Sequence, residues 1–329
     1  MSEVGAPDAP VPAAPAEPSA SLAGIGLLLL HRGDPPSVEG TRDWLRAWYS
    51  DPYAFTSSFG RGTQGFFGGI AARLDASTWQ QRLTESGGRS PLEAQANELG
   101  ELLAKKLGVP VAFGALYGAP KIGDALAKLK EQGATRVVGL SLHPQKCDRF
   151  LKPILRALEE SGSEVSVIDR YATSKGYVEA LRAAITEGVE RAPGATVLFC
   201  ALPIEAKDDR AGDPYLAQLK DTTTAVMEGL TAPWKVSWLS MGAPGITSEA
   251  ALQSLRKSGA DSVVLVPLGG AVDELTSVHA VDVTLRATAK AAGFSKVERA
   301  RPPVGYSVFI EALAHEVRAH LARLKALGF

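Results

Sequence analysis

Short runs of consecutive hydrophobic residues alternate along the chain with longer stretches in which hydrophobic positions recur every three or four residues. The short runs are typical of strands buried on both faces of a parallel sheet, and the longer pattern is typical of amphipathic helices. Eight strands are expected at residues 24–30, 109–115, 135–142, 164–169, 195–200, 234–239, 262–267 and 296–299. Strands that alternate with helices in this way predict an α/β protein with parallel sheets that are covered on both faces.

The expected strands divide equally between two halves of the chain. Residues 1–22 are rich in Ala and Pro and lack the basic start and apolar centre of a signal peptide, so we expect a disordered tail. An N-terminal domain is expected at 23–172 and a C-terminal domain at 173–329, each a Rossmann-like unit with a four-stranded parallel sheet flanked by helices. Two similar units of this kind place a ligand cleft between them.

Two helix starts and one long connection stand out in the first half. Ser37 is expected to cap a helix that ends near residue 49, and Ser90 before Pro91 has the pattern of a capped helix start.

Residues 51–88 are expected to be irregular. A long connection with many aromatic residues favours a lid or a binding wall. Its aromatic residues include Phe55, Phe59, Phe66, Phe67 and Trp79.

The composition excludes several classes of protein. Lys and Arg number 35 and Asp and Glu number 36, so no basic surface for a nucleic acid is indicated. Cys147 and Cys200 are the only cysteines, too few for a four-thiolate iron–sulfur cluster. The apolar run Leu27 to Leu30 is too short to cross a bilayer. We therefore expect a cytoplasmic protein with reduced cysteines and no transmembrane segment.

A set of short motifs resembles, in order, those of the ferrochelatase family, whose members insert ferrous iron into a porphyrin. Gly87 to Leu92 resembles the family's Gly-Gly-x-Ser-Pro-Leu, and Gly212 to Tyr215 matches its Gly-Asp-Pro-Tyr. Further similarities are at Gly26 to Pro35, Asp51-Pro52, Tyr117-Gly118 with Pro120, Pro144-Gln145, and Leu265 to Pro267 with Asp273. The resemblance runs from Gly24 to the end. It implies two chelatase-type domains, a tetrapyrrole-sized cleft and a place in haem (porphyrin) biosynthesis.

The chain departs from the family's pattern at the positions to which the resemblance assigns the chemistry. Where the family reads Leu-Phe-Ser-Ala-His-x-Leu-Pro, this chain has Leu198 to Pro203, and the proton-accepting His is missing. Thr276 stands at the position of the family's essential Glu, and His31 stands in place of an Asn. Other departures are Leu116, at the position of an Arg, and Lys146 to Arg149, which replaces a Ser/Thr-rich loop. Because Leu and Thr accept no proton near neutral pH, we expect iron insertion to be weak or lost.

Other residues are candidates to replace the missing groups. Glu274 and His279 are the candidate catalytic substitutes, although on a helix Glu274 would face away from Thr276. His143 and Cys147 are four residues apart and on a helix would share a face, as a pair for a soft metal or haem iron. The alternative interpretation is a packing role for His143 and a small buried hydrophobic residue in Cys147. The candidates for porphyrin contact are His31, Tyr117, His143 and Asp273.

Three functions remain open on the sequence. The first is a ferrochelatase-like protein that binds porphyrin or haem, with another haem-pathway enzyme as a candidate partner and with little or no chelatase activity of its own. The second is an active ferrochelatase, a lyase in the usual classification, in which Glu274, His31, His143 or His279 replaces the missing groups. The third is a non-enzymatic interaction protein on a chelatase scaffold. None of them requires a cofactor, because iron and the macrocycle would be ligands or substrates.

Overall fold

The computed structural model describes residues 22–55, 60–203, 212–239 and 245–328. It contains two four-stranded parallel sheets, which confirms the predicted fold class. The first sheet has the order β2-β1-β3-β4 and the second the order β6-β5-β7-β8. The strands are β1 (Ile25–His31), β2 (Val111–Ala115), β3 (Arg136–Ser141), β4 (Val165–Ile168), β5 (Thr196–Ala201), β6 (Trp234–Trp238), β7 (Ser262–Leu268) and β8 (Lys296–Arg299). The expected tail at residues 1–22 lies, except for its last residue, outside the described part of the chain.

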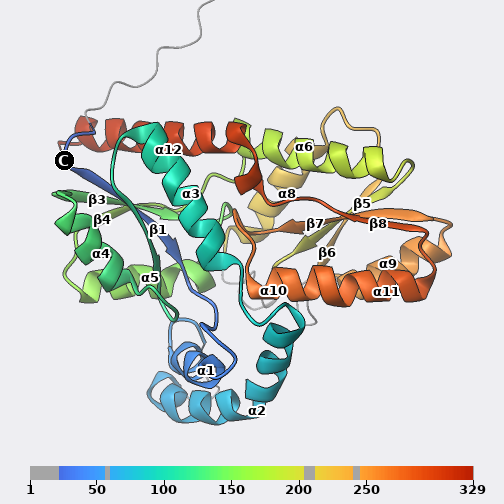
Figure 1. The fold of residues 1–329 in the computed structure, drawn as a ribbon, viewed down its shortest axis with the longest axis horizontal. Coiled ribbons are helices and arrows are strands. Elements are labelled where there is room, and N and C mark those ends of the chain that lie inside the picture. The colour runs from blue at the N-terminus through green and yellow to red at the C-terminus, as the bar shows by residue number, and fades with distance from the viewer. Residues whose placement is uncertain (1–21, 56–59, 204–211, 240–244, 329) are drawn as a thin grey trace, which may run out of the picture.

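Helices cover both sheets. In the first half they are α1 (Thr41–Ser50), α2 (Gln64–Glu85), α3 (Leu92–Leu107), α4 (Ile122–Glu131) and α5 (Asp148–Glu160). In the second half they are α6 (Lys175–Arg191), α8 (Tyr215–Met227), α9 (Ser248–Lys257), α10 (Leu275–Val278), the π-helical segment η2 (His279–Leu285), α11 (Arg286–Ala292) and α12 (Ser307–Ala326). Two short 3₁₀ segments are η1 (Arg61–Thr63) and η3 (Pro303–Gly305). Figure 1 shows α1 and α2 as a lobe that projects from the two sheets.

Each sheet is built around a central strand whose side chains are buried on both faces. Every residue of β1 and of β5 is buried, as a near-continuous hydrophobic run in a covered parallel sheet requires. The two halves are joined by α12, which packs against α6 and also against α3 of the first half. At the α6 contact, a Cβ on Gly176 would come within 2.3 Å of the Val308 carbonyl oxygen, so this close approach requires glycine. The domain boundary expected between residues 172 and 173 stays a prediction.

The expectation that residues 51–88 are irregular is wrong, because α2 occupies most of this stretch. One face of α2, which includes Gly68, Ala72 and Leu83, is buried. A second face is also apolar but exposed. Its exposed residues are Phe66, Phe67, Ile70 and Leu74. A helix with two apolar faces has no single hydrophobic stripe, so its sequence lacks the period by which helices are recognised.

The start of α1 also differs from its prediction. Ser37 does not cap the helix, which begins at Thr41. The Ser37 Oγ instead accepts the Gly40 N–H at 3.1 Å and stabilises a turn before the helix. The helix at Ser90 is closer to expectation, because the Ser90 Oγ accepts the Leu92 N–H at 3.2 Å and α3 begins at Leu92.

Candidate metal and macrocycle site

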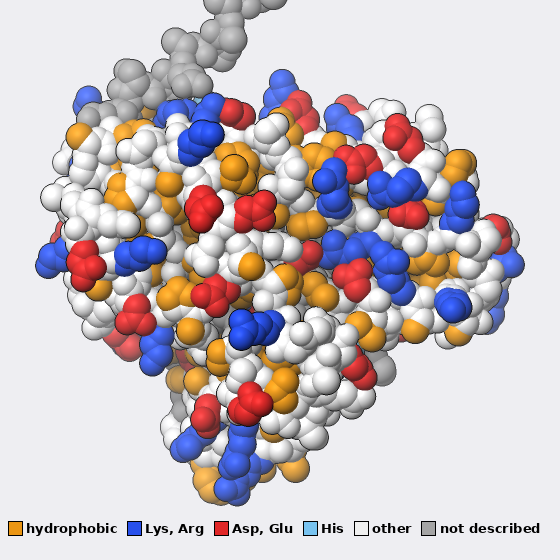
Figure 2. Space-filling view, viewed as in Figure 1, with side chains coloured by type: hydrophobic (Ala, Val, Ile, Leu, Met, Phe, Trp, Pro, Cys, Tyr) orange, Lys and Arg blue, Asp and Glu red, His pale blue; other side chains and the backbone are white. Residues whose placement is uncertain are grey.

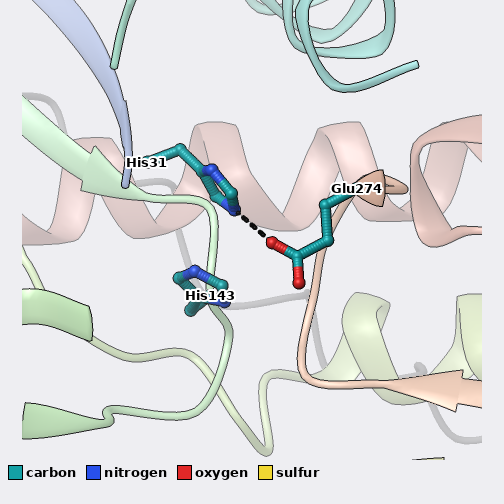
Figure 3. Close-up of side chains that lie close together, drawn as sticks. All are labelled: His31, His143 and Glu274. Atoms are coloured by element: carbon teal, nitrogen blue, oxygen red, sulfur yellow. Dashed lines mark ion pairs between the residues drawn. The ribbon is translucent and has the colours of Figure 1, made fainter. Parts of the chain in front are cut away.

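Two histidines and one glutamate from three distant segments meet between the halves of the molecule (Figure 3). His31 ends β1, and His143 follows β3, which pairs directly with β1. Neighbouring parallel strands end at the same edge of a sheet, so these two imidazoles lie together, with ring centroids 4.7 Å apart. Glu274 comes from the second half, in the segment between β7 and α10. The possible ligand atoms of the three residues all lie within 4.8 Å of one another.

The hydrogen bonds of the two imidazoles differ and assign each ring a tautomer. The Nδ1 of His31 accepts the Gly33 N–H at 3.0 Å, so the neutral ring carries its proton on Nε2, which is 3.2 Å from the Glu274 Oε2. The Nδ1 of His143 lies 2.8 Å from the Gly269 carbonyl oxygen and must donate to it. The Nε2 of His143 therefore holds a lone pair, and it is buried with no hydrogen-bond partner. An imidazole oriented by a backbone carbonyl, with its other nitrogen unoccupied, has the arrangement of a metal ligand.

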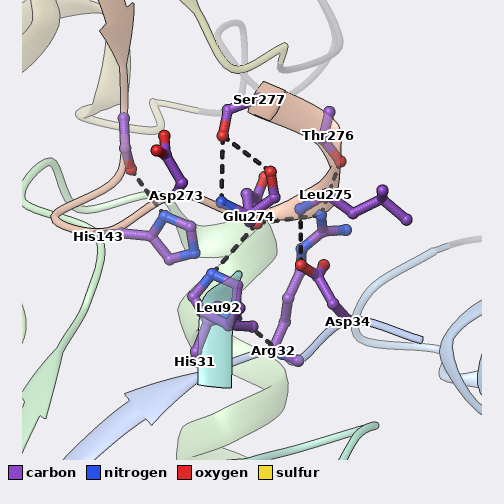
Figure 4. A network of polar contacts seen from close by, with 12 residues as sticks. His31, Arg32, Asp34, Leu92, His143, Asp273, Glu274, Leu275, Thr276 and Ser277 are labelled. Carbon is purple, nitrogen blue, oxygen red and sulfur yellow. Dashed lines mark hydrogen bonds and ion pairs between the residues drawn. The ribbon is translucent and has the colours of Figure 1, made fainter. Parts of the chain in front are cut away.

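The charges around Glu274 keep it ionised although it is buried (Figure 4). The Arg32 Nη2 is 3.2 Å from the Glu274 Oε2 and 3.2 Å from the Thr276 Oγ1. Burial alone would raise the pKa of Glu274, but the charge of Arg32 and the hydrogen bond from His31 outweigh it and hold that pKa below its ordinary value. Burial, assisted by the neighbouring His31, lowers the pKa of His143 to about 3. At neutral pH the cluster therefore offers a carboxylate and a neutral imidazole, the forms that bind divalent metals.

A second buried carboxylate fixes the start of α10 to the first half. The Asp34 Oδ2 accepts the Leu275 N–H at 2.7 Å and the Ser90 hydroxyl at 2.5 Å. Burial, and then the nearby charge of Glu274, raise the pKa of Asp34. The Asp34 carboxylate thus connects the start of α10 to the segment before α3, and so holds Glu274 in front of the two histidines.

Two candidate pairs do not have the geometry expected for them on a helix, because neither pair lies within one. Glu274 does not face away from Thr276, because its backbone is extended (φ −123°, ψ 166°) and it precedes the first turn of α10, so both side chains contact Arg32. His143 and Cys147 share no helix face, because α5 begins only at Asp148. Cys147 is buried, its burial raises the pKa of its thiol, and it is not part of the described His/Glu cluster.

A cavity of about 440 Å³ lies against this cluster, between the α1–α2 lobe and the two halves. Glu274 and Arg32 are part of its wall, whereas His31 and His143 are buried and are not among its lining residues. The end of β5 contributes Leu202 to the wall. The other lining residues are Trp48, Trp79, Arg82, Arg149, Phe150, Pro203, Leu239, Glu249, Leu275, Thr276, His279, Ala280 and Thr284. The size and the aromatic lining suit a drug-sized or larger organic ligand.

The remaining candidates divide between the cavity and other places. His279 lines the cavity, and its Nε2 is 2.8 Å from a carboxylate oxygen of Glu85 on α2. Tyr117 and Asp273 are not lining residues of this cavity: Tyr117 donates to Asp51 at 2.7 Å, and Asp273 pairs with Arg299. Of the aromatic residues expected in a binding wall, Trp79 lines the cavity, Phe66 and Phe67 point to solvent, and Phe59 lies outside the described residues.

Sequence reasoning did not nominate Arg32, Asp34 or Arg82 as site residues. Arg32 directly follows His31, where charged residues are unusual beside a buried strand, and this was the available signal. Asp34 and Arg82 carry no such signal, because their roles depend on contacts with segments far along the chain.

The two parallel sheets with a cavity between them define a chelatase-type fold, and solved structures agree. The structure titled SirB from Bacillus subtilis with Fe3+ matches with a TM-score of 0.56 at 12% identity, over 92% of this chain and 97% of that chain. The protein DR2241 from Deinococcus radiodurans, described as structurally similar to chelatases, matches with a TM-score of 0.51 at 12% identity, over 88% of this chain and 53% of that chain. At these identities the matches establish the fold alone.

Sequence comparison identifies the family. The model of the ferrochelatase family matches residues 24–321, and the chain belongs to that family. A ferrochelatase from Citrifermentans bemidjiense is 28% identical over 89% of this chain and 97% of its own length. A ferrochelatase from Nostoc punctiforme is 26% identical over 89% of this chain and 81% of its own length. In the described part of the chain, no helix has the length and apolarity to cross a membrane.

Proposed function

We propose that this chain is an active ferrochelatase that inserts ferrous iron into a porphyrin-type macrocycle with His31, His143 and Glu274 in place of the family's usual residues. The observation that carries the proposal is the convergence of these three side chains, whose possible ligand atoms lie within 4.8 Å of one another, beside a cavity of about 440 Å³ that Glu274 lines. Membership of the ferrochelatase family supports the reaction. Weak or lost activity was expected because the family's proton-accepting His and its essential Glu are absent. The cluster supplies imidazole and carboxylate groups at another place and therefore favours an active enzyme.

His143 and Glu274 are the residues assigned to the incoming ion. Imidazole nitrogen and carboxylate oxygen both suit divalent iron. The Nε2 of His143 offers a lone pair that nothing else in the described structure occupies, and the Glu274 carboxylate is held in its ionised form. Because Glu274 also lines the cavity, it is the member of the cluster nearest to a bound ring.

We assign the removal of the pyrrole protons to Glu274, with His31 as the residue that orients its carboxylate. A porphyrin loses two pyrrole protons as the ion enters, and a positioned acceptor speeds such a step by about 10²–10⁴-fold. The Nε2–H of His31 faces Glu274 at 3.2 Å, while the Nδ1 of His31 accepts the Gly33 N–H, so His31 donates to the carboxylate and orients it rather than accepting a proton from it. Each proton that Glu274 accepts from the ring then leaves to water through the cavity that Glu274 lines.

The residues that stand at or near the positions of the family's His and Glu are consistent with a replacement of those groups by His31, His143 and Glu274. Leu202 and Thr276, which stand near or at the positions of the family's His and Glu, both line the cavity. The proposed groups come instead from the ends of β1 and β3 and from Glu274, two residues before Thr276. The chemistry would thus have moved from the end of β5 to Glu274 in the same half and to the ends of β1 and β3 in the other half, at the same cavity.

The test is anaerobic iron insertion, followed by the change in porphyrin absorbance. The wild-type chain is expected to turn over, whereas His143→Gln and Glu274→Gln should each lose about 100-fold or more in rate. His315→Gln on the exposed face of α12 is the matched control and should keep the full rate. A wild-type chain that binds porphyrin but inserts no iron would refute the proposal and favour lost activity. Full rates in both site variants would refute the assignment of residues.

A further inference from the structure

His279 and Glu85 form a pair of imidazole and carboxylate beside the cavity. The Nε2 of His279 is 2.8 Å from the Glu85 Oε2, and the Glu85 Oε1 accepts a side-chain N–H of Gln81 at 2.8 Å. The hydrogen bond from Gln81, and then that from His279, hold the pKa of Glu85 below its ordinary value, so its carboxylate is ionised at neutral pH. A neutral His279 ring must therefore donate from Nε2, which leaves its lone pair on Nδ1.

The two members of this pair come from different parts of the fold. Glu85 is the last residue of α2 in the α1–α2 lobe, whereas His279 is the first residue of η2 in the second half. Figure 2 shows the lobe as a projection whose base is packed against the rest of the molecule. His279 lines the cavity, and its side chain is 16% exposed. A carboxylate that holds one nitrogen of an imidazole orients the ring and stabilises the imidazolium that forms when the other nitrogen takes a proton.

The proposed reaction benefits from a second proton acceptor, because two pyrrole protons leave for each ion that enters. The pKa of Glu274 is held below its ordinary value, so its carboxylate suits the ion but holds a proton only weakly. A base is most effective when its pKa is near the pH of the reaction, and the ordinary pKa of an imidazole, about 6.5, is nearer to neutral than that of a carboxylate, about 4. Among the residues that the structure describes, His31 and His143 do not line the cavity, whereas His279 does.

We propose that His279, oriented by Glu85, is a second catalytic base that takes a pyrrole proton on its Nδ1 as iron enters the ring. This inference rests on the proposed function, because it names a further residue of the same reaction. The pyrrole N–H bond breaks, its electron pair stays on the ring nitrogen, and the proton forms an imidazolium that the Glu85 carboxylate stabilises. The imidazolium then releases the proton to water. Because Glu85 belongs to the lobe, the base is complete only while the lobe lies against η2.

The test separates a base from a merely structural contact between the lobe and η2. His279→Gln keeps a side-chain N–H for Glu85, whereas His279→Ala keeps none. In anaerobic iron insertion followed by porphyrin absorbance, both variants should lose about 100-fold in rate, because neither side chain accepts a proton. Added free imidazole should restore part of the rate of His279→Ala. Glu85→Gln should also be slower than wild type, and Glu98→Gln, on the exposed face of α3, is the matched control and should keep the full rate.

Porphyrin binding, measured by tryptophan fluorescence, guards against a folding or binding defect. Both His279 variants should bind porphyrin as tightly as wild type. A full rate in His279→Gln would assign His279 a structural contact and overturn the proposal while leaving the proposed function intact. Weaker porphyrin binding that accounts for the lost rate, or a lack of rescue by imidazole, would overturn it in the same way. A wild-type chain that inserts no iron would instead refute the proposed function, and this inference with it.

Discussion

The buried pair of Arg32 and Glu274 gives a sharp test of how the site is built. Only 4% of Arg32 and 2% of Glu274 are exposed, and their charged atoms are 3.2 Å apart. Glu274→Gln keeps a similar shape and an oxygen acceptor but leaves the guanidinium buried without its main counter-charge. Removal of one partner of a buried pair costs about 3–5 kcal/mol. The nearby Asp34 can supply part of the lost charge, so we expect a loss of about 3 kcal/mol in the free energy of unfolding.

The assay is urea unfolding at pH 7, followed by far-UV circular dichroism. The matched control is Glu187→Gln, which removes one partner of the exposed pair between Glu187 and Arg301. An exposed pair contributes about 1 kcal/mol or less. If the two variants lost the same free energy, the Arg32–Glu274 pair would not be a buried, water-excluded pair, and the argument for a preorganised Glu274 would fail.

Three further predictions concern pH, packing and a hydrogen bond. The pKa of His143 is about 3 in the folded chain and about 6.5 when unfolded. Between these two pH values the unfolded state therefore binds a proton at His143 that the folded state does not bind. Wild-type stability should therefore fall as the pH drops below 6.5, by up to about 1.4 kcal/mol per unit from this group. His143→Gln should remove that part of the slope in unfolding measurements from pH 7 to 4. Gly68→Ala would place a Cβ 2.5 Å from the Tyr49 backbone and should lower the melting temperature. Gly69 has open space around it, so Gly69→Ala should stabilise α2 by about 1 kcal/mol. Tyr117→Phe loses the bond to Asp51 and should cost about 1 kcal/mol without changing porphyrin affinity; a large loss of affinity would place Tyr117 at the ligand.

The regular parts of the fold could be predicted because their signals are local. The hydrophobic runs of β1 and β5 and the turns around them indicated buried parallel strands, and the structure has both. The helix α2 could not be recognised, because its glycine and alanine face packs on α1 while a second apolar face is exposed. The cleft expected between two such units agrees with the cavity, whose wall includes Leu202 at the end of β5.

The candidate site was predictable as a set of residues but not as an arrangement. His31, His143 and Glu274 were all named as candidates, because they stand at strand ends or beside a family motif. Their convergence depends on pairing between β1 and β3 and on the extended backbone at Glu274, which no local pattern encodes. The same holds for Arg32, whose partner is 242 residues away in the chain. From the sequence alone, the missing His before Pro203 was a strong indication of lost function. The arrangement of His31, His143 and Glu274 in the structure makes that indication weaker.

The most direct test of the central claim is whether the cluster binds the ion. Equilibrium dialysis against ferrous iron without oxygen or porphyrin measures this apart from catalysis. The account predicts that wild type and His315→Gln each retain one ion per chain and that His143→Gln retains none. Failure of the wild type to retain iron, or equal retention by His143→Gln, would contradict the claim that His143 and Glu274 receive the iron.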